Sequence, residues 1–338
     1  MRVKFLSLAS GSSGNCYYLE ANNKAILIDA GIPKRAITNK LKESGMSIEK
    51  VMGLFITHDH SDHVRTAGVI GEHLHIPVYA TKAVHIGLQQ KAKHYDLSPA
   101  LTPVSIRNVE YDVVKVLSGT PFKVTPFKVP HDCTDNVGYY IEVGSEGEEP
   151  VKFCLVTDCC CFVDNQVDPM KILEARNCGV LDDYLWSEFT EISANIKKYL
   201  RKADHIVIES NHDLYMLEHG RYPKKLQDRV RGVDKLYRRP GGHLNNEECA
   251  HLLDDIYHDS IKHVFLCHLS QDNNTPEKAY ECSEKVLLSK GVKIASAEDP
   301  DGVVLKPLNR TDSTGPYIFE NGQLSLDFED SQLTLDFE

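Results

Sequence analysis

The segment at positions 57–63, which reads THDHSDH, constrains this chain more than any other part of it. It places three imidazoles and two carboxylates within six positions, directly after the apolar run 51–56. That run is typical of a short buried strand, and Ser61 is a candidate N-cap for a helix that begins near Asp62. The pattern therefore predicts a loop between a strand and a helix in which nitrogen and oxygen donors are concentrated.

A loop of this kind can bind metal, because its backbone can point alternate side chains inward. His58 and His60, two positions apart, are predicted to face one ion, and Asp62 and His63 a second. The alternative is a solvated polar loop that happens to be rich in histidine. Short motifs do match by chance, but the length of this one favours the metal site.

Composition sets the broad class. The chain has 338 residues, of which 41% are hydrophobic, so it can bury a substantial core. No break in composition divides residues 1–308, and we expect them to form one domain. No apolar run approaches the roughly 18 residues that a membrane helix needs, so no membrane partner is expected.

The ten cysteines include three in a row at positions 159–161 and no Cys-x-x-Cys pair, which favours a reducing compartment and a cytoplasmic location.

Short apolar runs and helical patterns alternate along most of the chain, which indicates the α/β (α+β) class. The expected strands cover residues 3–9, 16–20, 25–29, 51–56, 77–80, 122–129, 152–157, 203–209, 263–267 and 292–296. The expected helices cover residues 33–44, 64–74, 81–93, 247–257 and 276–290.

The pattern His-x-His-x-Asp-His at positions 58–63 resembles the signature of the metallo-β-lactamase superfamily. This resemblance implies a four-layer αββα metallo-β-lactamase sandwich, with a metal site at one edge of its two sheets. His60 stands where the iron-binding redox branch of that superfamily has Glu, so the hydrolytic branch is implied.

The resemblance also implies ligands farther along the chain, near the ends of expected strands. His131 stands where the superfamily has its third histidine, Asp158 where it has a bridging carboxylate, and His268 where it has the last ligand. Asp29 stands where the superfamily supports the metal-binding loop from outside the ligand set. Strand ends lie on rigid elements that can converge on one edge of the fold.

The implied set holds two divalent metal ions with one shared carboxylate. One ion is held by His58, His60 and His131, the other by Asp62, His63 and His268, and Asp158 bridges them. Imidazole and carboxylate donors suit zinc or manganese. Such a pair holds a hydroxide as nucleophile, and Asp62 can orient it. His243 and His212, both in polar loops, are candidates to protonate the leaving group, and either could be structural instead.

Five segments together resemble the YycJ/WalJ group of that superfamily, namely residues 7–16, 131–139, 209–213, 242–246 and 268–274. That group comprises DNA exonucleases acting from 5′ ends, with a place in mismatch repair. The implied function is a dinuclear-metal phosphodiesterase, a 5′-exonuclease on DNA in replication-linked or mismatch repair. One departure is the stretch before Gly242, which is longer and more basic than the group's pattern. The alternatives are a small-molecule hydrolase of the lactonase or thioesterase type, a ribonuclease, and a binding protein whose metal is structural.

A basic strip interrupts an otherwise acidic chain. The net charge of −11 argues against indiscriminate binding to nucleic acid, but residues 221–239 contain eight Lys or Arg and only two Asp. The residues predicted to contact DNA are Arg221, Lys224, Lys225, Arg229, Arg231, Arg238 and Arg239. Tyr222 and Tyr237 could stack on bases. A solvated helix face is the alternative.

Residues 309–338 form an acidic tail that has no Lys or Arg after Arg310, and we expect it to be flexible on its own. It contains the repeats QLSLDFE at 323–329 and QLTLDFE at 332–338, which resemble the peptide by which bacterial DNA enzymes dock on the replication sliding clamp. The predicted anchors are Gln323, Leu324, Leu326, Phe328, Gln332, Leu333, Leu335 and Phe337. The alternative is that both repeats pack on the edge of the domain itself.

Overall fold

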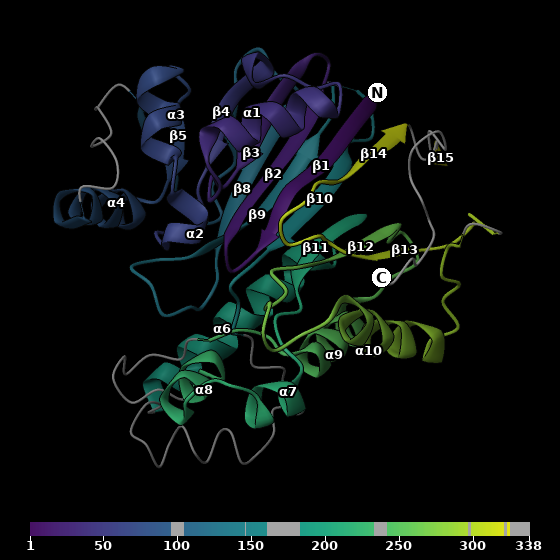
Figure 1. Ribbon diagram of the computed structural model, residues 1–338. Helices are drawn as coiled ribbons and strands as arrows, with labels where there is room; N and C mark the ends of the chain where they lie inside the picture. The colour runs from purple at the N-terminus through teal and green to yellow at the C-terminus, as the bar shows by residue number, and fades with distance from the viewer. Residues whose placement is uncertain are drawn as a thin grey trace.

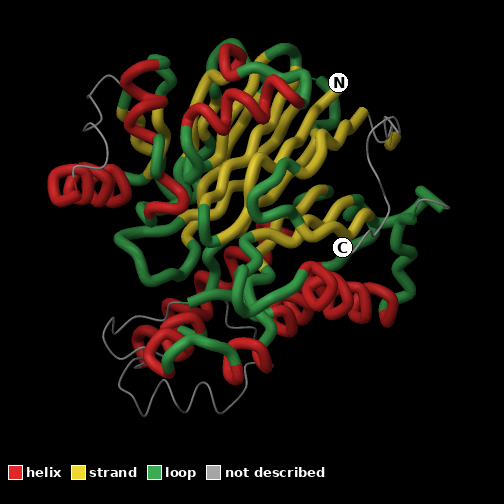
Figure 2. The backbone as a smooth tube through the Cα atoms, in the orientation of Figure 1, coloured by secondary structure: helices red, strands yellow, loops and turns green. Residues whose placement is uncertain are grey.

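Two β-sheets pack face to face, and helices cover the outer face of each (Figure 1). The computed structural model describes residues 1–95, 105–145, 147–160, 183–232, 242–296, 299–320 and 323–324. Figure 2 shows the same two sheets between helical layers. The predicted four-layer αββα sandwich is confirmed.

The first sheet contains both the N-terminal and the C-terminal strands of the described chain. Its order is β15 (Gln323–Leu324), β14 (Thr314–Glu320), β1 (Arg2–Gly11), β2 (Gly14–Ala21), β3 (Lys24–Ile28), β4 (Val51–Phe55), β5 (Val78–Ala80) and β6 (Ile106–Asn108). β1 is antiparallel to β14 and β2, whereas β3 to β6 run parallel to one another.

The second sheet carries most of the later strands. Its order is β13 (Val304–Pro307), β12 (His263–Cys267), β11 (His205–Glu209), β10 (Val151–Val156), β9 (Val137–Val143), β8 (Phe122–Lys128) and β7 (Lys115–Val116). β10, β11, β12 and β13 are parallel. The carboxyl ends of these four strands therefore meet at one edge of the sheet, and the loops that follow them lie together.

The helices form the two outer layers. α1 (Lys34–Glu43), η1 (Ile48–Lys50), α2 (Ser61–Val64), α3 (Ala67–His73) and α4 (Lys82–Tyr95) accompany the first sheet. α6 (Asp183–Leu200), α9 (Asn246–Ile256) and α10 (Pro276–Ser289) accompany the second, and α7 (Leu214–His219) and α8 (Lys224–Val230) lie below α6 in Figure 1. Local sequence sets several of their starts. For example, Asn245 and Glu248 form a capping box at α9.

The core between the sheets is aromatic. The ring of Phe5 on β1 packs against Phe153 on β10 at 5.8 Å and against Phe265 on β12 at 5.0 Å between ring centroids. Two further apolar clusters lie outside the sheets, under the helices of each layer. The hydrophobic faces of both sheets are thus covered on both sides, and their edges are left for polar loops.

Two predicted elements are wrong. The helix expected over residues 64–74 is split into α2 and α3, because the Thr66 hydroxyl donates to the carbonyls of Ala30 and Ile32 at 3.1 and 3.0 Å and holds the chain there. The strand expected over residues 292–296 makes only an isolated bridge, between Ile294 and Val303. The edge position next to β12 is filled by β13 instead.

The domain boundary expected at residue 308 comes too early. β14 pairs along β1, from Arg2 opposite Glu320 to Ser7 opposite Thr314, and therefore belongs to the first sheet. The Phe319 ring packs on His205 at 4.1 Å between centroids and is 5% exposed. The acidic composition of residues 309–338 concealed this strand, although Tyr317, Ile318 and Phe319 within it are apolar. No helix among the described residues is long and apolar enough to cross a membrane.

Candidate metal centre

Three strands end in the same unusual way at one edge of the sandwich. Asp29, Asp158 and His268 follow β3, β10 and β12, and each adopts a left-handed backbone conformation, with φ of 58°, 52° and 55°. This conformation is uncommon for residues other than glycine, and it concentrates at functional sites. Here it turns each side chain sharply off its strand toward the other two.

The THDHSDH segment joins β4 to α2, as predicted: residues 57–60 lie in the loop and residues 61–63 begin the helix. Its place is secured by a close backbone approach: a Cβ atom on Gly31 would lie 1.6 Å from the carbonyl oxygen of Asp62. The Thr57 amide donates to the Asp29 carboxylate at 2.8 Å, and the Ala30 amide donates to the His63 carbonyl at 2.7 Å. The loop after β3 therefore holds the loop after β4 at both of its ends.

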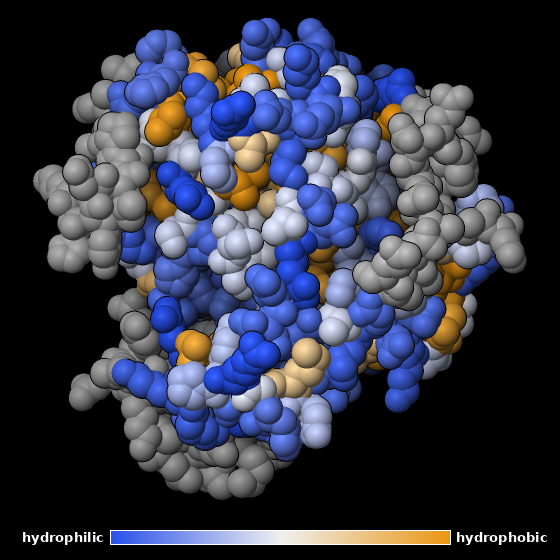
Figure 3. All heavy atoms as spheres, in the orientation of Figure 1, coloured by the Kyte–Doolittle hydropathy of each residue, from blue (hydrophilic) through white to orange (hydrophobic). Residues whose placement is uncertain are grey.

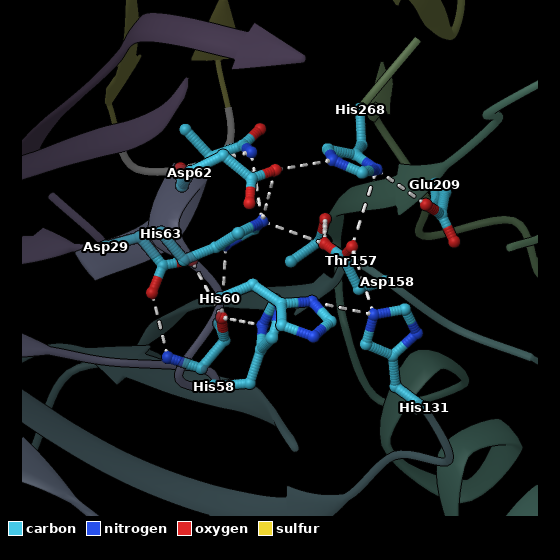
Figure 4. Close-up of polar contacts among 12 residues, drawn as sticks. Asp29, His58, His60, Asp62, His63, His131, Thr157, Asp158, Glu209 and His268 are labelled. Carbon is cyan, nitrogen blue, oxygen red and sulfur yellow. Dashed lines mark hydrogen bonds and ion pairs between the residues drawn. The ribbon is translucent and has the colours of Figure 1, made fainter. Parts of the chain in front are cut away.

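The predicted ligands come together in the structure (Figure 4). Within each of three groups, one potential ligand atom per residue lies within 4.8 Å of the others. The groups are His58, His60, His131 and Asp158; Asp62, His63 and His268; and Asp158, Glu209, His243 and His268. Asp158 is shared between two groups, and it stands centrally in the close-up view.

The hydrogen bonds of Thr57 determine the tautomer of His58. The Thr57 hydroxyl donates to Asp29 at 2.8 Å, so it must accept from Nδ1 of His58, which lies 3.1 Å away. Nε2 of His58 then carries no proton, and this buried atom has no hydrogen-bond partner among the described residues. A buried lone pair without a partner is costly, and a cation would satisfy it.

Three more histidines are held in the same tautomer, with the proton on Nδ1. Nδ1 of His63 donates to Asp29 at 2.7 Å, Nδ1 of His131 to the Gly242 carbonyl at 3.0 Å, and Nδ1 of His268 to Glu209 at 2.8 Å. Each ring is left with Nε2 facing the centre. Nε2 of His63 lies only 3.0 Å from an Asp158 oxygen. Two acceptors this close require a proton or a cation between them, so the donor set fits divalent metal ions.

The electrostatics of the centre also favour cations. Burial raises the pKa of Asp62, but the charges of His63 and His268 outweigh burial and lower it to about 2. Burial lowers the pKa of His268, but Asp158, Asp62 and Glu209 outweigh burial and raise it to about 10. The same negative field that favours a proton on His268 favours a divalent ion in its place. In contrast, burial and then its histidine neighbours hold the pKa of His58 well below its usual range.

Glu209, at the end of β11, was missed by the sequence analysis. Its carboxylate is fully buried, and one oxygen accepts from Nδ1 of both His243 and His268 at 2.8 Å. The other oxygen accepts from the amides of Cys159 and Leu244 at 2.7 and 3.2 Å. Glu209 thus orients two histidines of the centre. Its sequence signals were its place at a strand end, where acids are common, and its place at the start of the segment 209–213, in which the resemblance gave it no role.

The two candidates for the leaving-group acid have different surroundings. His243 lies 3.6 Å from an Asp158 oxygen, and its ring centroid is 5.1 Å from that of His131. His212 is completely buried, its backbone bridges to Asn245, and its ring belongs to none of the three groups found among the described residues. The structure therefore brings His243, but not His212, into the centre.

Asp59 lies inside the motif but faces away from the ligands. Its carboxylate accepts from the Thr134 hydroxyl at 2.6 Å and pairs with Lys91 at 3.2 Å. A Cβ atom on Gly87 would come within 2.3 Å of the same carboxylate. Asp59 therefore joins the motif to the loop that carries His131, and it does not complete the ligand set.

The basic strip lies partly on α8. Arg229 pairs with Asp132, the neighbour of His131, at 2.7 Å, and Arg231 pairs with Glu218 at 3.3 Å. The side chains of Arg221, Lys224 and Lys225 are exposed. Tyr237, Arg238 and Arg239 lie outside the described residues.

The tail is described only at its start. The backbones of Gln323 and Leu324 form β15, which pairs with β14. The predicted anchors Leu326, Phe328, Gln332, Leu333, Leu335 and Phe337 lie outside the described residues.

Residues 9–146 match the family model of the metallo-beta-lactamase superfamily. The αββα sandwich and the His/Asp centre at its edge agree with this match, so this part of the chain is similar to the hydrolases of the metallo-β-lactamase superfamily.

Over most of its length the chain is also similar to curated exonucleases. It is 29% identical over 297 residues to exodeoxyribonuclease YycJ of Bacillus anthracis, covering 88% of this chain and 94% of that protein. It is 28% identical over 278 residues to exodeoxyribonuclease WalJ of Streptococcus pneumoniae, covering 82% and 85% of the two chains. A solved structure, the metallo-beta-lactamase fold protein YhfI from Bacillus subtilis, shares the fold with a TM-score of 0.55 at 13% identity, over 94% of this chain and 99% of that one.

Proposed function

We propose that this protein is a cytoplasmic, dinuclear-metal-dependent phosphodiesterase that acts as a 5′-exonuclease on DNA in replication-linked or mismatch repair. The observation that carries the proposal is the set of histidine Nε2 atoms that face one centre around Asp158. The similarity to two proteins named exodeoxyribonucleases supports DNA as the substrate.

The groups of potential ligands in the structure support the roles proposed for these residues. His58, His60 and His131 would hold one ion, Asp62, His63 and His268 the other, and Asp158 both. When bound, two divalent cations, zinc or manganese, supply a water of lowered pKa and offset the negative charge that develops on the phosphate. Asp62 stays ionised next to His63 and His268, so its carboxylate can accept a hydrogen bond from that water and aim it.

His243 is the proposed donor of a proton to the leaving oxygen. The pKa of Glu209 is lowered to about 2, because the hydrogen bonds and charges of His243 and His268 outweigh its burial, so this ionised carboxylate accepts from Nδ1 of His243. The side chain of His243 is 19% exposed. Its Nε2 can then carry a second proton, since burial lowers the pKa of His243 but Glu209 outweighs burial and raises it. A positioned acid of this kind contributes about 10²- to 10⁴-fold to a rate.

DNA is preferred over the other substrates for two reasons. α8 brings Arg229 against Asp132, next to His131, so a guanidinium stands at the rim of the proposed centre. Exposed Arg221, Lys224 and Lys225 continue the positive surface, which a lactone or thioester would not need. The alternatives remain a small-molecule hydrolase of the lactonase or thioesterase type and a ribonuclease.

The tail motifs support a further part of the proposal, which is docking on the bacterial sliding clamp. An extended peptide with Leu and Phe anchors fits an apolar groove, and Gln adds a directional hydrogen bond. Replacing Leu326, Phe328, Leu335 and Phe337 by Ala should abolish binding of the chain to its cognate clamp in titration calorimetry. If the variant with all four changes still binds the clamp, docking through the tail motifs is contradicted.

One assay tests the main proposal. Duplex DNA labelled at either end and an RNA of the same sequence are incubated with the metal-reconstituted protein and with the Asp158→Asn variant. We expect stepwise release of nucleotides from the 5′ end of DNA, and no release by the variant. Cleavage of RNA alone would favour the ribonuclease, and hydrolysis of lactones or thioesters without action on either nucleic acid would favour the small-molecule hydrolase.

A further inference from the structure

The short helix α7 carries an exposed pair of stacked rings. Tyr215 and His219 lie one turn apart, with ring centroids 4.1 Å apart and ring planes inclined by 22°. Nδ1 of His219 lies 3.0 Å from the Tyr215 carbonyl, to which it donates, so the imidazole is fixed in orientation. Tyr215 is 68% exposed, more than any other large hydrophobic side chain among the described residues. The fold itself gains little from a ring in this position.

The support under the pair is rigid. Asp213 caps α7 by accepting from the Met216 amide at 2.8 Å, and its own amide donates to the Asn273 carbonyl at 2.8 Å. On the opposite face of the helix Leu217 is fully buried. A firmly held aromatic face offers contact area at small cost in conformational entropy.

The surroundings of the pair are positive. Residues 214–232 contain five Lys or Arg and two acidic residues, in a chain whose net charge is −11. Lys224 pairs with Asp228 at 3.0 Å, whereas exposed Arg221 and Lys225 have no acidic partner within the part of the chain that the structure describes. Cations without a partner next to a flat ring suit a ligand that combines phosphates with planar groups.

The pair is also within reach of the metal centre. Tyr215 follows Glu209 by six residues, so their Cα atoms lie within roughly 21 Å of each other at about 3.5 Å per residue. A few nucleotides of an extended single strand would span a distance of this order. Figure 3 shows a hollow with a hydrophilic surface between the sandwich and the layer of α7 and α8.

We propose that Tyr215 and His219 form a stacking platform for an unpaired base of single-stranded DNA whose other end lies in the metal centre. This inference rests on the proposed function and names the form of its substrate. The bases of a duplex already stack on one another, so only a single strand can present a free face to the rings. Arg221 and Lys225 would contact the phosphates on either side of that base.

The test measures binding and needs no cleavage. The full-length protein is titrated with a fluorescent single-stranded phosphorothioate oligonucleotide, which resists hydrolysis, and with the same oligonucleotide in which several internal bases are missing. Stacking on an aromatic ring is worth about fivefold or more in affinity. We expect Tyr215→Ala to lose at least this factor for the intact oligonucleotide and to leave binding of the abasic one nearly unchanged. Tyr215→Phe, which keeps the ring, should bind like the original protein.

Leu288→Ala is the matched control, because Leu288 is 53% exposed on α10, outside the positive region. It should bind both oligonucleotides unchanged. Equal losses for the intact and abasic strands in Tyr215→Ala, or no loss for either, would overturn the platform while leaving the exonuclease intact. An original protein that binds neither strand would overturn the single-stranded substrate and the platform with it, whereas the assay on end-labelled duplex DNA tests the exonuclease separately.

Discussion

The Asp29 carboxylate accepts a hydrogen bond from Nδ1 of His63 at 2.7 Å, and both side chains are completely buried. The same carboxylate accepts from the amide and the hydroxyl of Thr57. Asp29 therefore determines which nitrogen of His63 faces the candidate metal centre. Through the hydroxyl of Thr57 it also determines the tautomer of His58. One residue outside the ligand set thus orients a ligand of each proposed ion.

We expect Asp29→Ala to weaken metal binding by about 10- to 100-fold, because outer carboxylates of this kind fix the orientation and basicity of metal-bound histidines. The free energy of unfolding should fall by about 1–3 kcal/mol, since buried donors lose their acceptor. Equilibrium dialysis against zinc or manganese and denaturant unfolding measure the two effects. Asp29→Asn, which keeps an acceptor oxygen and suits the left-handed backbone, should lose less of both. Identical losses in the two variants would contradict the proposed orienting role.

Asp158 is the residue on which both proposed ions depend. We expect Asp158→Asn to lose most of its bound metal and its nuclease activity, because the amide carries no negative charge between two cations. Asparagine is chosen over alanine since it tolerates the left-handed conformation that Asp158 adopts. Elemental analysis, activity and circular dichroism would be measured on one preparation. Full nuclease activity in a metal-poor, folded variant would exclude the mechanism.

His243 should matter only when the leaving group needs a proton. We expect His243→Ala to slow DNA hydrolysis by about 10²- to 10⁴-fold, the usual contribution of a positioned acid. Hydrolysis of bis(p-nitrophenyl) phosphate should fall far less, because nitrophenolate leaves without protonation. His212→Ala is the comparison, since its ring lies outside the three groups of potential ligands among the described residues. A similar loss on both substrates would show that His243 supports the metal centre instead.

The basic strip should act through salt-dependent binding. Each phosphate contact contributes about 0.7 to the slope of log affinity against log salt concentration for a single strand. Replacing Arg221, Lys224 and Lys225 together by Ala should therefore reduce this slope by about 2 and weaken binding at low salt. Lys285→Ala, at an exposed site on α10, shows the effect of removing one positive charge outside the strip and should leave the slope nearly unchanged. If the slope does not change, these residues do not contact DNA phosphates and only form a solvated face of the helix.

Truncation should distinguish the end of the fold from the start of the tail. Ending the chain at residue 308 removes β14, including buried Ile318 and Phe319, and exposes the rings of Phe265 and His263 that β14 covers. Losing a buried aromatic side chain costs about 3–5 kcal/mol, so this truncated protein should be unstable or insoluble. Ending the chain after Leu324 should keep both the thermal stability and the metal-dependent activity. Equal stability of the two truncations in thermal unfolding would contradict the place of β14 in the core.

The sequence was most informative where chemistry is concentrated in consecutive residues. His58, His60, Asp62 and His63 could be assigned together because one loop carries them all. The later ligands His131, Asp158 and His268 needed the resemblance, since single residues at strand ends have no local signature. Glu209 illustrates this limit: its role depends on two histidines that lie 34 and 59 residues farther along the chain.

Other errors have a similar origin in tertiary contacts. The charge of the C-terminal segment suggested a tail, but pairing with β1 and burial of Phe319 outweigh composition. The break between α2 and α3 depends on the contacts of Thr66 with the loop after β3. Neither set of contacts could be read from the local pattern, because each joins residues far apart in the chain.

The antiparallel pairing of β14 with β1 has a mechanical consequence. Ser10, near one end of β1, accepts from the amide of His268, whereas Arg2 at the other end lies opposite Glu320, where β14 ends. At about 3.3 Å per residue, the two ends of this strand are roughly 26 Å apart. Anything that binds the chain beyond Leu324 is therefore attached at the end of the first sheet that lies away from the candidate metal centre.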